Sequence, residues 1–303
     1  MITVADVQNE VPSLISRWGL GDAVGSAMVV DDIGGINLLT IGTPVLSLPS
    51  MIKGDAVGTS VLGSVGNYFS ALVAPYVFSG GLTLEGLSTA DPNGNSFSLI
   101  SIPGQAQLQF NGLNLAFNVW IGTTLHTLTA TNSLLGWPQH VIGTYDPLTA
   151  TQALYVDGQL VIQAVIGGNV GTSVAINTTG TTSTVSKTIT AIPTTTGMQL
   201  GGVVTAFGVV PSNSFITAIP SSTSITINAF PLANGSGEAI TVGMPVTIAF
   251  PTTVAATLAA AQDVAIYGAP LSTVRIKQHF QAFRQILSDP GHVRVYPQIG
   301  VYS

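Results

Sequence analysis

The chain has 303 residues, of which 46% are hydrophobic and only 7% are charged, with a net charge of −6 and no cysteine. This length has room for one large β domain or for two ordinary domains. Seven lysines and arginines are too few for a surface that neutralises nucleic-acid phosphates. The lack of cysteine excludes disulfides, thiolate metal sites and thiol catalysis. We therefore expect a neutral, hydroxyl-rich exterior and stability that comes from burial.

No targeting or membrane segment is predicted. The most apolar stretch, residues 252–271, is interrupted by Gln262 and Asp263, so no uninterrupted run is long enough for a membrane helix. The N-terminus lacks a basic region and carries Asp6 and Glu10 early, unlike a secretory signal. We expect neither a membrane nor a nucleic acid as partner.

Most of the chain is predicted to form short β-strands. Runs rich in Val, Ile, Thr and aromatic residues alternate with clusters of Gly, Pro, Asn and Ser, which is typical of sandwiches and barrels. The fold class predicted is therefore mainly β. The clearest strands are expected at 35–42, 96–102, 106–112, 113–122, 140–145, 153–161 and 263–268.

A hairpin is predicted at Asp157-Gly158, within 145–164. A two-residue type I′ turn needs positive φ at both central residues, and this pair tolerates that conformation. Asp157 is accordingly interpreted as a turn former, with contact to a ligand as the alternative.

Two helices are predicted, one near each end of the chain. The C-terminal helix is expected to begin after Ser272 as N-cap and to end before 289–291. Its apolar stripe consists of Ile276, Phe280, Phe283 and Leu287. A weaker N-terminal helix has Thr3 as its N-cap and ends at Pro12.

Residues 171–250 differ from the rest in composition. Lys187 and Glu238 are their only charged residues, and "ITAIP" occurs at 189–193 and 216–220. Two copies are too few for a solenoid. We expect one small β subdomain in which two strands each leave a sheet at a proline.

Four segments, in order, resemble a known family. They are "SLISRWGLGDAVGSAMVVDDIGG" (13–35), "KGDAVGTSVLGSVGNYFS" (53–70), "WPQHVIGTYDPLTATQALYVDGQLV" (137–161) and "DVAIYGAPLSTVRIKQHFQAF" (263–283). Together they resemble the laminin-G-like, concanavalin A-type jelly roll of bacterial and phage proteins. The resemblance implies a jelly-roll sandwich with a short C-terminal amphipathic helix. In such domains the closing strands follow the hairpin shortly, whereas about 80 residues intervene here, so 171–250 is interpreted as an insertion into a loop.

The resemblance also implies a domain organisation and a setting. The jelly roll would cover 1–170 and 251–288, the inserted subdomain 171–250, and a C-terminal docking tail 289–303. The inserted segment looks like a small β module that recurs in phage structural proteins. Both features point to a virion structural protein, either a capsid decoration or a tail-fibre or spike component, that forms homo-oligomers and contacts other virion proteins.

Catalytic chemistry is not expected. Glucanases share this scaffold and need two carboxylates facing a cleft. The only glutamates, Glu10, Glu85 and Glu238, have no second carboxylate two or four residues away on a strand. The four histidines, His126, His140, His279 and His292, accompany no Gly-x-Ser-x-Gly elbow. A glucanase is the less favoured alternative, and His140 is interpreted as a satisfied, half-buried residue.

Calcium is the one ion that the resemblance brings in, because jelly rolls of this kind often hold it with carboxylates and carbonyls. The candidate ligands are Asp31, Asp32, Asp55 and Asp146. The competing interpretation is that these residues form turns and keep the surface soluble. No other cofactor is expected.

Two interaction surfaces are candidates. Sugar sites usually combine an aromatic face with amide and carboxylate groups, so a host-glycan site is considered at Tyr76, Asn93, Asn95 and Tyr145. Core packing is the default interpretation of Trp18, Trp120 and Trp137. The tail is expected to dock by strand addition through Val293, Val295, Tyr296, Ile299, Val301 and Tyr302.

Overall fold

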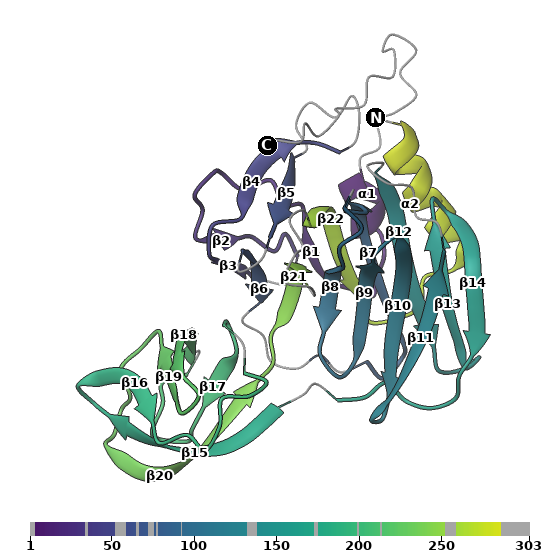
Figure 1. The fold of residues 1–303 in the computed structure, drawn as a ribbon. Helices are drawn as coiled ribbons and strands as arrows, with labels where there is room; N and C mark the ends of the chain where they lie inside the picture. Colours follow the sequence, from purple (N-terminus) through teal and green to yellow (C-terminus); the bar gives the residue numbers. More distant parts are fainter. Residues whose placement is uncertain are drawn as a thin grey trace.

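The structure is a computed structural model that shows a two-sheet β-sandwich with a small barrel inserted into it (Figure 1). The residues it describes are 4–33, 36–51, 59–64, 67–71, 76, 78–91, 93–131, 138–172, 175–198, 200–212, 214–251 and 259–285. The fold is thus mainly β, a concanavalin A-like jelly-roll sandwich with an inserted β subdomain and a short C-terminal helix, as the sequence predicts.

One layer, called sheet A, has eight strands. Their order is β14 (Gln159–Val165), β13 (Thr151–Val156), β12 (Gln139–Asp146), β7 (Leu82–Thr89), β22 (Ala259–Tyr267), β5 (Thr59–Gly63) and β4 (Val45–Pro49), and β1 (Leu14–Trp18) pairs with β22. All of these pairs are antiparallel.

The other layer, sheet B, also has eight strands. Their order is β11 (Thr124–Ala130), β10 (Asn114–Ile121), β9 (Ala106–Asn111), β8 (Phe97–Ile102), β21 (Val246–Pro251), β6 (Tyr68–Ala71), β3 (Leu38–Ile41) and β2 (Met28–Val29). The strands predicted near 35–42, 96–102, 106–112, 113–122, 140–145, 153–161 and 263–268 are confirmed.

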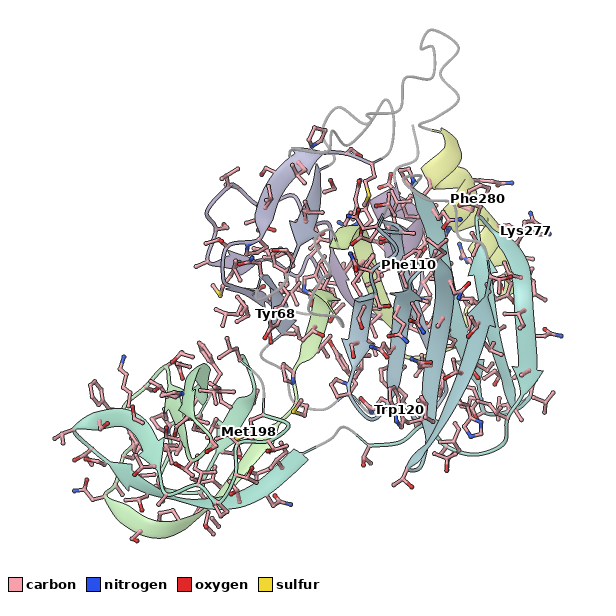
Figure 2. The ribbon with its side chains drawn as sticks, viewed as in Figure 1. Tyr68, Phe110, Trp120, Met198, Lys277 and Phe280 are labelled. Carbon is pink, nitrogen blue, oxygen red and sulfur yellow. The ribbon has the colours of Figure 1, made fainter. Side chains whose placement is uncertain are left out.

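The main core lies between the two sheets and is rich in aromatic side chains. Trp18, Phe97, Phe110 and Phe117 are fully buried in it, and Figure 2 shows Phe110 among the sandwich strands. Burying one such side chain stabilises the fold by roughly 1.5–3 kcal/mol. Gly143 on β12 is required by this packing, since a Cβ there would lie 2.3 Å from Cδ2 of Phe117. Core packing is therefore confirmed for Trp18, whereas Trp120 is partly exposed and Trp137 lies outside the described residues.

The inserted subdomain is a closed barrel of six strands. Its strand order is β15 (Ala175–Ser183), β16 (Ser186–Thr190), β19 (Ser224–Ile227), β18 (Ser214–Ser221), β17 (Val203–Thr205) and β20 (Gly235–Gly243). Its core is aliphatic apart from a methionine, Met198, which Figure 2 labels. Gly201 approaches β6 so closely that a Cβ there would lie 2.2 Å from Oγ of Ser70, so the barrel abuts the sandwich at this glycine.

One detail of the barrel differs from the prediction. The first "ITAIP" copy leaves its strand before the proline, because β16 ends at Thr190. The second copy does not, because β18 continues through Pro220 to Ser221. The pairing with β19 is irregular between Ala218 and Ser221, and an irregular ladder does not need the N–H that proline lacks.

Two helices lie on the outer face of sheet A. They are α1 (Val4–Asn9) and α2 (Thr273–Gln285), which pack against one another. Ser272 is confirmed as the N-cap of α2, since its Oγ accepts a bond from the Arg275 N–H at 3.3 Å. In the part of the chain that the structure describes, neither helix has the length and hydropathy needed to span a membrane.

The Asp157-Gly158 hairpin is confirmed. These residues connect β13 to β14 with φ values of 50° and 73°, the two positive angles that a type I′ turn needs. The Asp157 carboxylate also accepts a bond from the His140 N–H at 3.0 Å. Asp157 therefore shapes the turn and holds it against β12.

Candidate functional site

A buried cluster of four titratable side chains lies between sheet A and α2. Glu85 comes from β7, His140 from β12, Tyr267 from β22 and His279 from α2. The three strands are neighbours in the sheet, and side chains on one face of a strand recur every second residue. This pattern places Glu85, His140 and Tyr267 on the same outer face, where α2 adds the fourth residue.

Glu85 is the centre of the cluster and accepts hydrogen bonds from the other three. Its Oε1 lies 2.7 Å from Nε2 of His140, and its two oxygens lie 3.0 and 3.1 Å from Nδ1 of His279. The Tyr267 hydroxyl donates to Oε2 at 2.5 Å. Each of the four side chains is buried. One carboxylate therefore ties three sheet strands to the helix.

The cluster fixes the protonation of its two acidic members. Burial alone would raise the pKa of Glu85, but the charge of His279 and hydrogen bonds from His140 and His279 outweigh it and hold this pKa well below its usual range. Burial, followed by the charge of Glu85, raises the pKa of Tyr267 well above its usual value. At neutral pH Glu85 is therefore a carboxylate and Tyr267 a neutral hydrogen-bond donor.

The cluster is sealed by the aromatic side chains of α2. The His140 ring packs against the rings of Phe280 and Phe283, with centroids 6.2 and 4.2 Å away. Nδ1 of His140 and Nε2 of His279 are buried without a hydrogen-bond partner in the described part of the chain. A substrate could reach the Glu85 carboxylate only if α2 moved away. The arrangement is that of a polar anchor for the helix.

Sequence reasoning missed this cluster. His140 was expected to be half-buried, but it is 2% exposed and its partner is a carboxylate 55 residues away in sequence. The sequence did not mark Glu85 as a site residue, because the alternation of apolar and polar residues assigns a charged residue on a strand to the solvent face. The available signal was His279, a polar residue three positions after Ile276 on the apolar stripe of α2.

The candidate calcium ligands form separate loop contacts. Asp31 accepts backbone bonds from Arg17, Ile33 and Ile36 at 2.9–3.1 Å, and Asp32 forms an ion pair with Arg17. Asp146 accepts bonds from the Leu148 N–H and the Thr149 hydroxyl, both at 2.9 Å. These contacts are those of turn formers.

The fourth candidate ligand, Asp55, lies outside the described residues. Among the residues that are described, no group of three or more His, Asp or Glu side chains is arranged to hold a metal ion. The calcium site therefore remains a prediction that the contacts of Asp31, Asp32 and Asp146 do not favour.

The aromatic rim expected around a sugar does not form, because both tyrosines are in the interior. Tyr76 is 8% exposed, its ring stacks on Phe78 and its hydroxyl lies 3.3 Å from Oγ of Ser16. Burial raises the pKa of Tyr76 to about 12. Tyr145 is fully buried, and its hydroxyl donates to the Gly168 carbonyl at 2.5 Å. Neither ring presents a face to solvent.

The two asparagines of that candidate site do lie together in one loop. Asp91 organises it by accepting a bond from the Asn93 N–H at 2.8 Å and from Nδ2 of Asn95 at 3.1 Å. The Asn93 side chain is exposed. The loop is thus ordered and polar, but Tyr76 and Tyr145 are not part of its surface.

An apolar surface occurs at the end of the barrel that lies farthest from the sandwich. The barrel joins the sandwich where Ala175 pairs with Gly243, and the opposite end is where Thr182 pairs with Gly235. The turns at this opposite end expose four large apolar side chains. They are Val185, Phe207, Phe230 and Leu232, exposed by 84%, 106%, 51% and 62%, and we call them the barrel end.

Hydrogen bonds between the turns hold the barrel end together. The Leu232 N–H donates to the Val209 carbonyl at 2.7 Å, and the Thr184 N–H donates to Oδ1 of Asn234 at 2.8 Å. Nζ of Lys187 lies 5.2 Å from the centroid of the Phe230 ring, a cation–π contact. Exposed apolar groups gathered in one place usually mark an interaction surface. Sequence reasoning missed this one because Phe207 and Phe230 resemble core residues in a strand-rich segment.

The proposed docking residues of the tail, Val293, Val295, Tyr296, Ile299, Val301 and Tyr302, lie outside the described residues. So does Leu287, the last member of the predicted helix stripe. These assignments remain predictions.

Comparisons with known proteins yield structural likeness only. No family model matches the chain, and no curated protein sequence matches it. The receptor-binding domain of botulinum neurotoxin type G aligns over 89% of this chain and 51% of its own, with 10% identity and a TM-score of 0.47. The binding domain of Paraclostridial Mosquitocidal Protein 1 aligns over 91% and 53%, with 10% identity and a TM-score of 0.48.

A third similar structure is the binding domain of botulinum neurotoxin DC in complex with rat synaptotagmin II. It aligns over 89% of this chain and 52% of its own, with 10% identity and a TM-score of 0.48. The chain therefore spans about half the length of the structures it matches.

Proposed function

We propose that this chain is a non-enzymatic virion surface protein, a capsid decoration or a fibre component, whose jelly roll carries the barrel as a contact element. The observation that carries the proposal is the contrast between a polar cluster that is buried and an apolar cluster that is exposed. The clustered acid–base group around Glu85 is sealed beneath α2, whereas the barrel end exposes Val185, Phe207, Phe230 and Leu232. A protein built in this way is suited to fitting against a surface rather than to turnover.

The barrel end is the contact element in this proposal. Its turns lie away from the sandwich, so a partner can reach them without displacing the main fold (Figure 1). Apolar side chains exposed to this extent are stabilised when a neighbour covers them. Neighbouring subunits or other virion proteins are the partners that fit this requirement.

Incorporation into particles tests the proposal. We expect the double variant Phe207→Ser/Leu232→Ser to fold normally but to be depleted from purified particles, as measured by immunoblot against the major capsid protein. The matched control is Leu148→Ser, because Leu148 is 94% exposed in a turn of the sandwich. Loss of incorporation in the control, or full incorporation of the double variant, contradicts the role of the barrel end.

The C-terminal tail is a second contact in this proposal. Deleting residues 292–303 is expected to reduce incorporation while leaving the sandwich folded, because a docking strand contributes to assembly and not to the core. Circular dichroism of the purified truncated chain reports on folding, and particle composition reports on docking. Normal incorporation of the truncated chain rules out docking through the tail.

Glycan binding is the second candidate function. It is favoured by the ordered loop in which Asp91 positions Asn93 and Asn95, since amide side chains held in this way can bond sugar hydroxyls. A glycan array with the wild type and with Asn93→Ala/Asn95→Ala separates the two functions. Saturable binding that the double variant loses supports a host-glycan adhesin, whereas a pure decoration protein gives no saturable signal.

A further inference from the structure

The edge strands of the two sheets are not equally protected against pairing with another chain. An edge strand presents unpaired N–H and C=O groups, and proteins usually block such edges with charges, prolines, bulges or covering segments. Within the described residues, the strands with an open side are β1, β2, β4, β11 and β14. The protection of each can be compared directly.

Three of these strands, β1, β2 and β4, are protected. β2 has only two residues, and β4 contains Pro49 and an irregular register between Val45 and Leu48. The open side of β1 is occupied where Asp31 accepts the Arg17 N–H at 3.1 Å and the Asp32 N–H donates to the Arg17 carbonyl at 2.9 Å. β11 has neither a proline nor a bulge, and it contacts β13 and β14 of the other sheet.

β14 lacks most of these protections. Its sequence, QLVIQAV, contains no charged residue and no proline, and Val165 is 80% exposed. One bulge occurs beside Val161, where Leu154 pairs with Ile162 and Tyr155 pairs with Leu160. The segment from Ile162 to Val165 pairs regularly with β13 and presents a straight edge.

One hydrogen bond shows which backbone N–H and C=O groups of this segment point toward β13 and which point to the open side. The Ile166 N–H donates to the Ala150 carbonyl at 2.6 Å, so the backbone polar groups of Ile166 face β13. In an antiparallel ladder the polar groups of successive residues point alternately to the two sides. Those of Ala164 and Ile162 therefore also face β13, and those of Gln163 and Val165 point to the open side.

Among the described strands, none pairs with the outer side of this segment, and Gln163 and Val165 are exposed. Figure 1 shows β14 at one margin of the sandwich and the barrel on the opposite side. α2 approaches the other end of the strand, since a Cβ on Gly158 would lie 3.0 Å from Phe280.

We propose that β14 pairs antiparallel with β14 of a second copy of this chain, joining the two A sheets across a two-fold axis at Ala164. Gln163 of each copy then faces Val165 of the other, and each pair exchanges two backbone hydrogen bonds. The strand can pair with its own copy because it carries no charge, so two copies meet without like-charge repulsion although the chain as a whole has a net charge of −6. The pairing also covers the two exposed Val165 side chains.

The absence of cysteine allows a direct test by disulfide trapping. At the proposed axis the two Ala164 residues form a non-hydrogen-bonded pair with Cα atoms about 4.5 Å apart, within the range that a disulfide spans. Ala164→Cys is therefore expected to give a covalent dimer under mild oxidation. Leu148→Cys, which is more exposed but lies in the turn between β12 and β13 and not on the paired strand, is the control and is expected to remain monomeric in a non-reducing gel.

A second variant tests the hydrogen bonds themselves. Gln163→Pro removes an N–H that points to the open side, so it leaves the bonds to β13 intact and blocks the partner strand. We expect the wild type to be dimeric by light scattering at tens of micromolar, Gln163→Pro to be monomeric with an unchanged circular dichroism spectrum, and Gln163→Ala to remain dimeric. A monomeric wild type, or a dimer that survives Gln163→Pro, overturns the proposal. If Gln163→Pro fails to fold, the trapping experiment decides alone, and equal cross-linking at 148 and 164 also overturns it.

Discussion

The sandwich and the barrel use their aromatic residues in opposite ways. The sandwich buries Trp18, Phe97, Phe110 and Phe117, whereas the barrel has an aliphatic core and exposes Phe207 and Phe230. In the sandwich, the buried carboxylate of Glu85 anchors α2 to sheet A. The larger unit is thus built for stability, and the smaller unit, whose core needs no aromatic ring, has its rings free for contact.

The largest effect on stability is expected from breaking the anchor in the sandwich. Glu85→Ala leaves His140, His279 and Tyr267 without their shared acceptor, so we expect the sandwich to lose about 3–5 kcal/mol. Chemical denaturation followed by tryptophan fluorescence measures this loss, because all three tryptophans lie outside the barrel. Glu238→Ala in the barrel is the control and should change the same transition by less than about 0.5 kcal/mol. Equal effects would show that the two units do not differ as described.

A core substitution in the barrel is expected to destabilise the barrel and not the sandwich. Ile225 is fully buried in the barrel core, and Ile225→Ala is expected to cost about 2–5 kcal/mol through lost burial and a cavity. Hydrogen exchange should then show faster exchange in 175–243 and unchanged protection in β7 and β12. If protection in those two sandwich strands falls equally, the sandwich and the barrel unfold together and are not separate units of stability.

Acid should weaken the sandwich through Glu85. The pKa of Glu85 is lowered in the folded protein, so its stabilising contribution is complete above its unfolded value of 4.5 and is lost as the pH falls below that value. The slope approaches about 1.4 kcal/mol per pH unit for one group. Glu85→Gln, compared with wild type between pH 5 and pH 3, should have a flatter stability profile by about this slope. Identical slopes would mean that Glu85 is not the group responsible.

A smaller effect is expected at the hairpin. Asp157→Ala loses the bond to the His140 N–H and a residue that tolerates positive φ, at a cost of about 1–2 kcal/mol. Asp157→Asn keeps both features and should cost less than about 0.5 kcal/mol. Urea denaturation of the two variants checks the difference, and a similar cost for both would point to charge rather than turn geometry.

The smallest effect on stability is expected at the barrel end. Phe207→Ser removes a side chain that is fully exposed, so the free energy of unfolding should change by less than about 0.5 kcal/mol. The same change is expected to alter partner binding, which distinguishes a contact residue from a core residue. A loss of more than about 2 kcal/mol would place Phe207 in the core instead.

Local patterns predicted much of the fold. The turn at Asp157-Gly158, the cap at Ser272 and the run of β-strands all depend on neighbours in sequence, and each is present. The Glu85 cluster depends on pairing between strands and a helix up to 194 residues apart, which no local pattern encodes. Burial of Tyr76 and Tyr145 was missed for the same reason, since only the folded loops show which face each ring takes.

Hydrogen exchange on the protein alone and on the protein within assembled particles tests the central claim most directly. We predict new protection in 205–210 and 229–234, the turns that carry Phe207, Phe230 and Leu232 of the barrel end, with no change around Glu85. Protection that leaves these turns unchanged, or a glycan substrate whose turnover stops in Glu85→Gln while the fold is retained, would contradict a contact role for the barrel and a purely structural role for the anchor.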